Sequence, residues 1–251
     1  MLELLETGDG YIYNDLNVYK NLIEFTTTNI ETVNKTCIYS ISKINLKLTT
    51  NLVNVSYSNY KLKCPHDKTI DYLTANKLPR EGWEELIECW SCHDNEFKTM
   101  LDLNIKPRQK GILVSDLYFF INDCDLPFCC SKNKNSISKI FFNEIKVEGY
   151  SDQNFLYNFF MNYFKSNSLF FYELGGKSYE IIFFYNCTIV LVKDGKLHNY
   201  KAMKVGVKET EKKVLEQKFI NDYFKTQIQK SISKIGVEVL NYEVGFIIEM
   251  N

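Results

Sequence analysis

The sequence predicts an α+β fold: a strand-rich N-terminal sheet or sandwich, a helical insert containing cysteine and histidine, and a C-terminal antiparallel sheet with two helices. The first 63 residues hold short runs rich in β-branched and aromatic residues, without a helical stripe of useful length. The middle of the chain carries both tryptophans and most of the cysteines. The part of the chain from 136 onward alternates strand-like runs with two segments that have the apolar pattern of helices.

In the N-terminal half, partial alternation of apolar and polar residues predicts strands at 36–41, 44–48 and 52–57. The long apolar run 111–122 predicts one buried strand. The polar stretch 131–136 resembles a loop and is the expected boundary. We therefore expect domains at 1–130, with a helical block at 78–101, and at 136–251.

The C-terminal half is predicted to begin with a strand at 137–147. Ser151 or Asp152 can cap a following helix that runs to Lys165. Hairpin turns are expected at Gly175-Gly176 and at Asp194-Gly195, because glycine tolerates positive φ. A second helix at about 209–229 and an alternating strand at 236–250 complete the expected order.

Composition limits the function classes. The chain has 251 residues, with 45% hydrophobic and 24% charged, which is ordinary for a globular protein. A net charge of −1 gives no overall field toward nucleic acid or a membrane surface. No apolar run approaches the ~20 residues that cross a bilayer, and the acidic start does not resemble a signal peptide. We expect an intracellular protein whose cysteines are thiols or metal ligands.

The segment 78–97 carries the most distinctive chemistry. An apolar stripe at i, i+3, i+4 and i+7 predicts a helix, formed by Trp83, Leu86, Ile87 and Trp90. Asp94 can cap a second short helix, so the first helix is expected to break near 91–93. Cys92 and His93 would then lie at a corner between two helices.

A cysteine beside a histidine has three possible roles. An imidazolium can lower the thiol pKa and produce a nucleophile of the kind that thioester chemistry needs. Both groups can bind zinc, in this chain or in another. Alternatively, the pair can simply be buried, since free cysteine is among the most buried residue types. The residues alone leave these alternatives open.

The string Leu78-Pro79…Trp83…Leu86…Trp90-x-Cys92-His93…Phe97 resembles the signature block of the HECT-like ubiquitin-conjugating-enzyme-binding family of ubiquitin ligases. The runs 115–122 and 242–250 are similar to later strands of that family.

The resemblance implies two roles, in the nucleus and cytoplasm. One is a ligase that accepts ubiquitin from a conjugating enzyme through a cysteine thioester, with Cys92 as the catalytic residue. The other is a non-enzymatic partner that blocks or stabilises the metallo-β-lactamase-fold endonuclease of pre-mRNA 3′-end processing. In that role Trp83, Trp90, Cys92 and His93 would contact the nuclease, and Cys92 would bind its zinc. Whether the chain is an enzyme stays open; direct nucleic-acid or membrane binding is not expected.

A structural zinc site is the remaining expectation from the resemblance. The family has Cys-x-x-Cys pairs before and after the block, which here become Cys64-Pro-His66 and Cys129-Cys130. These four residues could supply four ligands. Their spacings are unfavourable, however, because residues so close in sequence rarely reach one tetrahedral ion. The alternative is a lost site replaced by packing. Of the others, Cys124 is expected in a loop, and Cys37 and Cys187 in the core.

Overall fold

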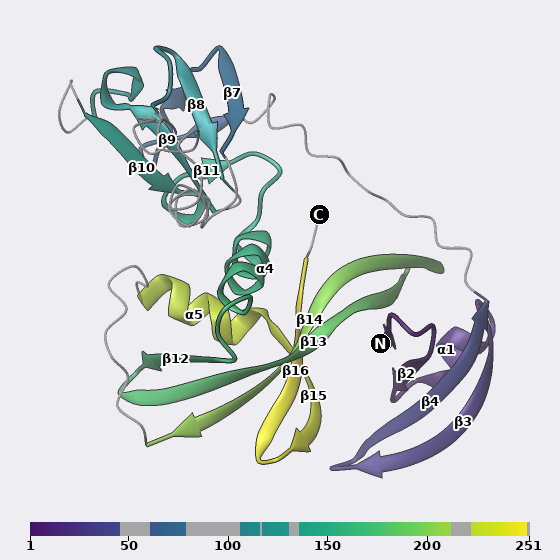
Figure 1. The fold of residues 1–251 in the computed structure, drawn as a ribbon. Coiled ribbons are helices and arrows are strands. Elements are labelled where there is room, and N and C mark those ends of the chain that lie inside the picture. Colours follow the sequence, from purple (N-terminus) through teal and green to yellow (C-terminus); the bar gives the residue numbers. More distant parts are fainter. Residues whose placement is uncertain (46–60, 79–105, 116, 131–135, 212–221, 250–251) are drawn as a thin grey trace, which may run out of the picture. The chain divides into compact units, whose positions relative to one another are not determined.

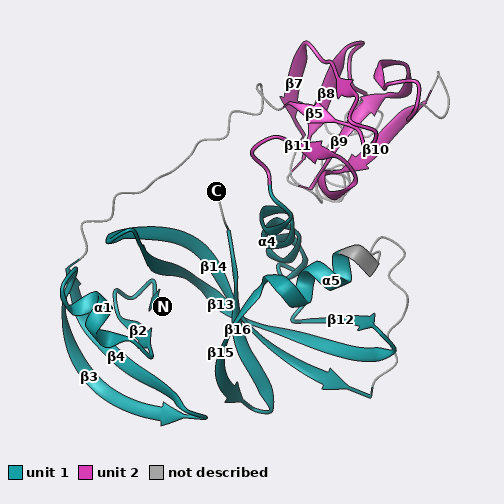
Figure 2. Cartoon of the chain, turned by 180° about the vertical axis from the view of Figure 1, so that it is seen from behind, with its two compact units in different colours: residues 1–53, 151–251 teal, residues 54–150 magenta. Residues whose placement is uncertain are grey.

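The computed structural model describes residues 1–45, 61–78, 106–115, 117–130, 136–211 and 222–249. Among these residues strands predominate, most of them antiparallel, and helices are few. The chain forms two compact units, unit 1 at Met1–Val53 with Ser151–Asn251, and unit 2 at Asn54–Tyr150 (Figure 2). In the part of the chain described, no helix combines the length and apolar character that a membrane span needs.

Unit 1 is built on a nine-stranded sheet (Figure 1). The strand order is β15-β16-β14-β13-β1-β2-β4-β3, and β12 also pairs with β13. The strands are β1 Leu2–Leu4, β2 Gly10–Tyr13, β3 Glu24–Val33, β4 Thr36–Asn45, β12 Leu169–Leu174, β13 Lys177–Lys193, β14 Lys196–Thr210, β15 Ile232–Val239 and β16 Tyr242–Ile248. Every pairing in this sheet is antiparallel.

The N-terminus belongs to the same unit as the C-terminal third. Strand β1 pairs with β13, with Leu2 opposite Val190 and Leu4 opposite Thr188. The expected division at 131–136 follows chain order, whereas the contacts group the first 53 residues with 151–251. The difference arises because a sheet can pair strands that are far apart in sequence, which no local pattern reveals.

Buried apolar side chains form a core cluster on each face of the central part of this sheet. On one face, α1 (Leu16–Lys20) packs through Tyr19, whose hydroxyl donates to the backbone carbonyl of Val190 at 2.9 Å. The opposite face holds a second core cluster of β2, β13, β14, β15 and β16 residues. Thr36 donates from Oγ1 to the carbonyl of Ile235 at 2.9 Å, which joins β4 to β15 across the curled sheet.

Two helices complete unit 1, α4 (Asp152–Tyr163) and α5 (Asp222–Ser231). The Ser151 hydroxyl accepts from the backbone N–H of Asn154 at 3.2 Å, so the predicted N-cap is confirmed. Both helices pack over a mostly aromatic core formed by Phe155, Phe159, Phe160, Phe170, Tyr172 and Phe224.

Gly206 of β14 lies where neighbouring side chains leave no room for a Cβ atom, and a substitution can test this close packing. A Cβ atom at this position would lie 2.7 Å from the Cβ of Tyr242 and 2.9 Å from Cγ2 of Ile182. We expect Gly206→Ala to lower the free energy of unfolding by about 1–3 kcal/mol, because the crowded side chains must shift. Chemical denaturation measures this change. Lys201→Ala, at an exposed site on the same strand, should stay within about 0.5 kcal/mol; equal effects would refute the crowding argument.

Unit 2 contains two small sheets. The first has the order β11-β5-β6, from Lys146–Val147, Leu62–Lys63 and Thr69–Ile70. The second has the order β10-β9-β8-β7, from Ile137–Phe141, Tyr118–Asn122, Gly111–Val114 and Thr74–Lys77, and its β7–β8 pair is parallel. The 3-10 turns η3 (Asp123–Asp125) and η4 (Phe142–Glu144) follow β9 and β10. Leu62, Ile70, Ile112, Phe119 and Ile121 are buried in this unit.

Several local predictions are confirmed and several are wrong. The strand at 36–41 and both glycine hairpins are present. The run 111–122 is two antiparallel strands, because the chain reverses where the backbone N–H of Ser115 donates to the carbonyl of Tyr118. The 3-10 turn η4 interrupts 137–147, and 236–250 is a β15–β16 hairpin that turns at Leu240 and Asn241.

Two further expectations are met only in part. Strand β14 continues to Thr210, and the described helix in this region begins at Asp222. Of the predicted strand 44–48, residues 44 and 45 close β4. The predicted strand at 52–57 and most of the helical block at 78–101 lie outside the described residues.

Candidate metal centre

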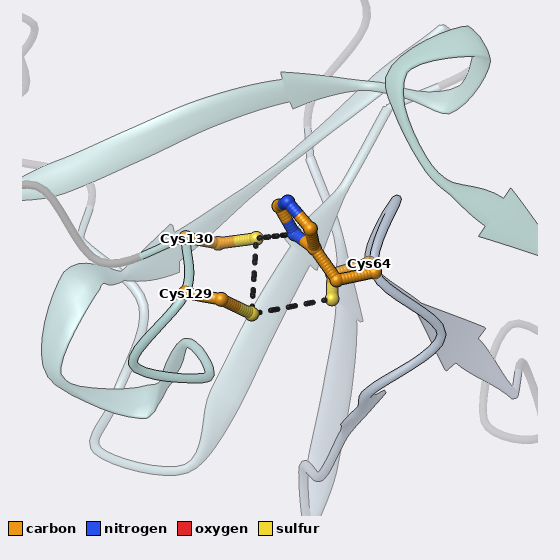
Figure 3. Close-up of side chains that lie close together, drawn as sticks. Cys64, Cys129 and Cys130 are labelled. Carbon is orange, nitrogen blue, oxygen red and sulfur yellow. Dashed lines mark hydrogen bonds between the residues drawn. The ribbon is translucent and has the colours of Figure 1, made fainter.

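Two turns of unit 2 bring together Cys64, His66, Cys129 and Cys130 (Figure 3). Cys64 follows β5, and the backbone N–H of Asp67 donates to its carbonyl at 2.9 Å, closing a turn that contains His66. Asp67 adopts a φ of 59°, which reverses the chain toward β6. The second turn follows η3, where the N–H of Cys130 donates to the carbonyl of Pro127 at 2.8 Å. Each turn supplies two side chains whose sulfur or nitrogen atoms can bind a metal ion.

The donor atoms are spaced as the ligands of one ion. The Sγ atoms of Cys64 and Cys129 are 3.7 Å apart, those of Cys129 and Cys130 are 3.8 Å apart, and Cys130 Sγ is 3.7 Å from Nδ1 of His66. All four donor atoms lie within 4.8 Å of one another. A tetrahedral zinc ion with bonds of about 2.3 Å to sulfur and 2.0–2.1 Å to nitrogen requires donor separations of about 3.6–3.8 Å. The three separations between neighbouring donors match these values, and the set as a whole spans up to 4.8 Å.

The electrostatics of the cluster favour a cation. Burial raises the pKa of the Cys64 thiol, but hydrogen bonds from the backbone N–H groups of Lys68 and His66, together with the other two thiols, lower it to about 7. Burial and the neighbouring thiols raise the pKa of Cys130 to about 12. The Cys64 thiol therefore loses its proton readily. Loss of a second proton from the cluster is unfavourable unless a positive charge lies next to the sulfur atoms. A divalent cation supplies that charge.

The donor set indicates which metal fits. Three soft thiolate sulfurs and one imidazole nitrogen form a Cys₃His set, which suits zinc in a closed structural site. The burial of these residues is graded, with Cys64 buried, Cys130 half-buried, and His66 and Cys129 exposed. With all four positions filled by protein atoms, a bound ion would join the two turns and leave no open position for catalysis. The expected difficulty of spacing does not arise, because both turns present their neighbouring side chains to one point.

The structure describes only some of the other residues that the sequence analysis singled out. Trp83, Trp90, Cys92 and His93 lie outside the described residues. Cys187 is buried in the core of unit 1, as predicted, and burial raises its pKa to about 12.

Two other cysteines also lie away from the cluster. Cys37 is half-buried, and Cys124 is exposed on η3. Neither joins the four donors.

Sequence reasoning missed a groove beside the cluster. This groove has a volume of about 560 Å³ and is lined by Lys68, Thr69, Asp71, Asp125, Leu126, Pro127, Phe128 and Cys129. Phe128 is 97% exposed, more than any other large hydrophobic residue in the described ranges. The apolar triplet Leu-Pro-Phe directly before Cys129-Cys130 is the sequence signal that could have revealed it.

Unit 2 is thus a small β-rich unit in which two turns present a Cys₃His set that could hold one metal ion. Residues 66–153 match the model of the family described as HECT-like ubiquitin-conjugating enzyme (E2)-binding, and the family resemblance is confirmed over this part of the chain. The match covers nearly all of unit 2 and includes His66, Cys129 and Cys130. No curated protein and no solved structure shows significant similarity to the chain.

Proposed function

We propose that unit 2 is a zinc-stabilised module through which this protein binds a ubiquitin-conjugating enzyme, in the manner of a ubiquitin ligase. The family match carries the proposal, because it lies almost entirely within one compact unit. The metal cluster supports it, because a site that joins two turns fixes the surface around them. In such a module the metal is structural, and partner contacts come from the side chains on and beside the turns.

Binding of purified, zinc-loaded full-length chain to a panel of ubiquitin-conjugating enzymes tests this proposal. Each enzyme is measured free and charged with ubiquitin, by calorimetry or surface plasmon resonance. We expect binding in the micromolar range or tighter by at least one enzyme. If no member of the panel binds the metal-loaded protein, the proposed function is wrong.

The role of Cys92-His93 is a separate part of the proposal. We favour a contact in which Cys92, with His93 beside it, reaches the zinc of the 3′-end processing endonuclease and blocks or stabilises that enzyme. Thiolate is a strong, soft ligand for zinc, and the Trp-x-Cys-His sequence is the feature that supports this role. The alternative is a ligase in which Cys92 carries ubiquitin as a thioester.

Cys92→Ala distinguishes these roles, with Cys89→Ala in the same segment as the matched control. If Cys92 binds the nuclease zinc, the first variant should weaken nuclease binding by at least about tenfold, which is the loss of about 1.4 kcal/mol. If Cys92 transfers ubiquitin, the same variant should lose the ubiquitin adduct that thiol reductants cleave. Unchanged nuclease binding by Cys92→Ala would eliminate the first role, and an undiminished adduct would eliminate the second.

A further inference from the structure

The groove beside the metal cluster carries an exposed apolar side chain, Phe128, that can act as an anchor for a partner. Leu126 is buried at 8% exposure, and its N–H donates to the carbonyl of Asp123 at 3.2 Å. Three and four residues after Leu126, Cys129 and Cys130 belong to the donor cluster. Phe128 therefore lies at the tip of a turn that is held by the core on one side and by the cluster on the other. These contacts hold the backbone that carries Phe128, which lowers the conformational entropy that the turn loses on binding.

The groove has polar features as well. Asp71 and Asp125 contribute two carboxylates to its lining, against the single ammonium group of Lys68. The backbone N–H of Lys110 donates to Oδ2 of Asp125 at 2.8 Å, and the side-chain amide of Asn122 donates to the same atom at 3.3 Å. These donors hold the Asp125 carboxylate in place. The lining thus combines an apolar surface from Leu126, Pro127 and Phe128 with an excess of negative charge.

We propose that this groove is the docking surface for the ubiquitin-conjugating enzyme, with Phe128 as its anchor. The proposal rests on the proposed function, and it adds the surface and the chemistry of the partner. All eight lining residues fall within the segment that matches the E2-binding family. The complementary partner surface presents an apolar pocket for Phe128, flanked by lysine or arginine facing Asp71 and Asp125. Aromatic anchors of this kind dominate the binding energy of many interfaces.

Phe128→Ser tests the anchor, and Leu73→Ser is the matched control, because Leu73 is 80% exposed in the same unit and does not line the groove. We expect Phe128→Ser to weaken binding of the conjugating enzyme by at least about tenfold and Leu73→Ser to change it less than about twofold. Both variants should keep the zinc content and thermal transition of the parent, since both side chains are in solvent. Asp71→Lys should also weaken binding, and most at low salt.

The outcomes separate this inference from the function on which it rests. If the parent chain binds a conjugating enzyme and Phe128→Ser binds it equally well, the docking surface lies elsewhere and only the inference fails. If the parent binds none, the proposed function fails with it. If Phe128→Ser instead abolishes self-association seen in sedimentation and leaves enzyme binding unchanged, the groove joins two copies of this chain and the inference is wrong.

Discussion

Replacing Cys129 with serine is expected to abolish zinc binding at the candidate metal centre and to remove the stabilisation that a bound zinc would give to unit 2. The Sγ atom of Cys129 lies 3.7 Å from that of Cys64 and 3.8 Å from that of Cys130, so the substitution removes one of the four candidate metal ligands. Its side chain is exposed, and a serine hydroxyl there leaves no buried polar group. Any loss of stability in this variant therefore results from the loss of metal binding and not from disruption of the core.

The size of the effect follows from mass action. A ligand that binds only the folded state at a thousandfold excess over its Kd stabilises by about 4 kcal/mol. We expect the parent to contain about one zinc per chain and a chelator to lower its stability by about that amount, whereas Cys129→Ser should contain under a tenth of a zinc and show no chelator effect. Elemental analysis and thermal unfolding with and without chelator measure both. Hydrogen exchange at the amides of β5 and β9 assigns the loss to unit 2.

Cys124→Ser is the matched control, because Cys124 is an exposed cysteine of the same unit outside the cluster. It should retain both zinc and the chelator effect. Protons compete with zinc for thiolates, so the parent should also lose zinc as the pH falls. A Cys129→Ser protein with parental zinc content would show that these four residues are not the metal site.

Local patterns predicted those parts of the fold that depend on one or two residues. The Ser151 cap and the Gly175-Gly176 turn are examples, because a side-chain oxygen or a positive φ is required at one position. The β15–β16 turn escaped prediction because Leu240 and Asn241 adopt φ values of 51° and 64° without glycine. Apolar residues continue on both sides of such a turn, so a hairpin resembles one long strand.

Contacts between distant segments could not be predicted in the same way. Residue type indicated the four candidate metal donors, but their spacing in the sequence does not reveal that two separate turns face each other. Phe128 was missed because exposure depends on tertiary structure. The pairing of β1 with β13 likewise joins residues nearly 190 positions apart, a separation over which sequence periodicity carries no information.

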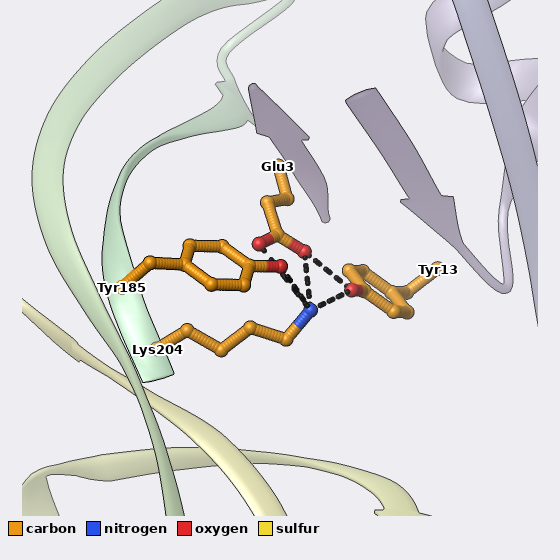
Figure 4. A network of polar contacts seen from close by, with 4 residues as sticks. All are labelled: Glu3, Tyr13, Tyr185 and Lys204. Carbon is orange, nitrogen blue, oxygen red and sulfur yellow. Dashed lines mark hydrogen bonds and ion pairs between the residues drawn. The ribbon is translucent and has the colours of Figure 1, made fainter. Parts of the chain in front are cut away.

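A second large effect is expected in unit 1, where Lys204→Met should lower the free energy of unfolding by about 3–5 kcal/mol. Glu3 of β1 is fully buried, and Lys204 of β14 donates to its Oε2 at 2.9 Å across the intervening strand β13 (Figure 4). The Lys204 ammonium also donates to the hydroxyls of Tyr13 at 3.1 Å and Tyr185 at 2.9 Å. Only 15% of the lysine side chain is exposed.

The loss of stability in Lys204→Met arises from the negative charge of Glu3, which stays in the protein without its partner. Methionine fills most of the lysine volume, but the Glu3 carboxylate then lies buried without its cation, and the Tyr13 hydroxyl cannot neutralise it. Burial and the charge of Glu3 raise the pKa of Tyr13 above its ordinary value, so this side chain stays a hydroxyl that donates to the carboxylate. Breaking a buried pair from one side is therefore more costly than removing both charges.

A double-mutant cycle provides the decisive measurement. Chemical denaturation of Lys204→Met, Glu3→Gln and the double variant should show the double variant more stable than Lys204→Met alone, because the uncompensated charge is gone. Lys177→Met is the matched control, since Lys177 and Glu209 form a 2.8 Å ion pair with both side chains more than half exposed; its effect should stay below about 1 kcal/mol. If Lys204→Met were no more destabilising than Lys177→Met, the N-terminal strand would not be held by a buried ion pair.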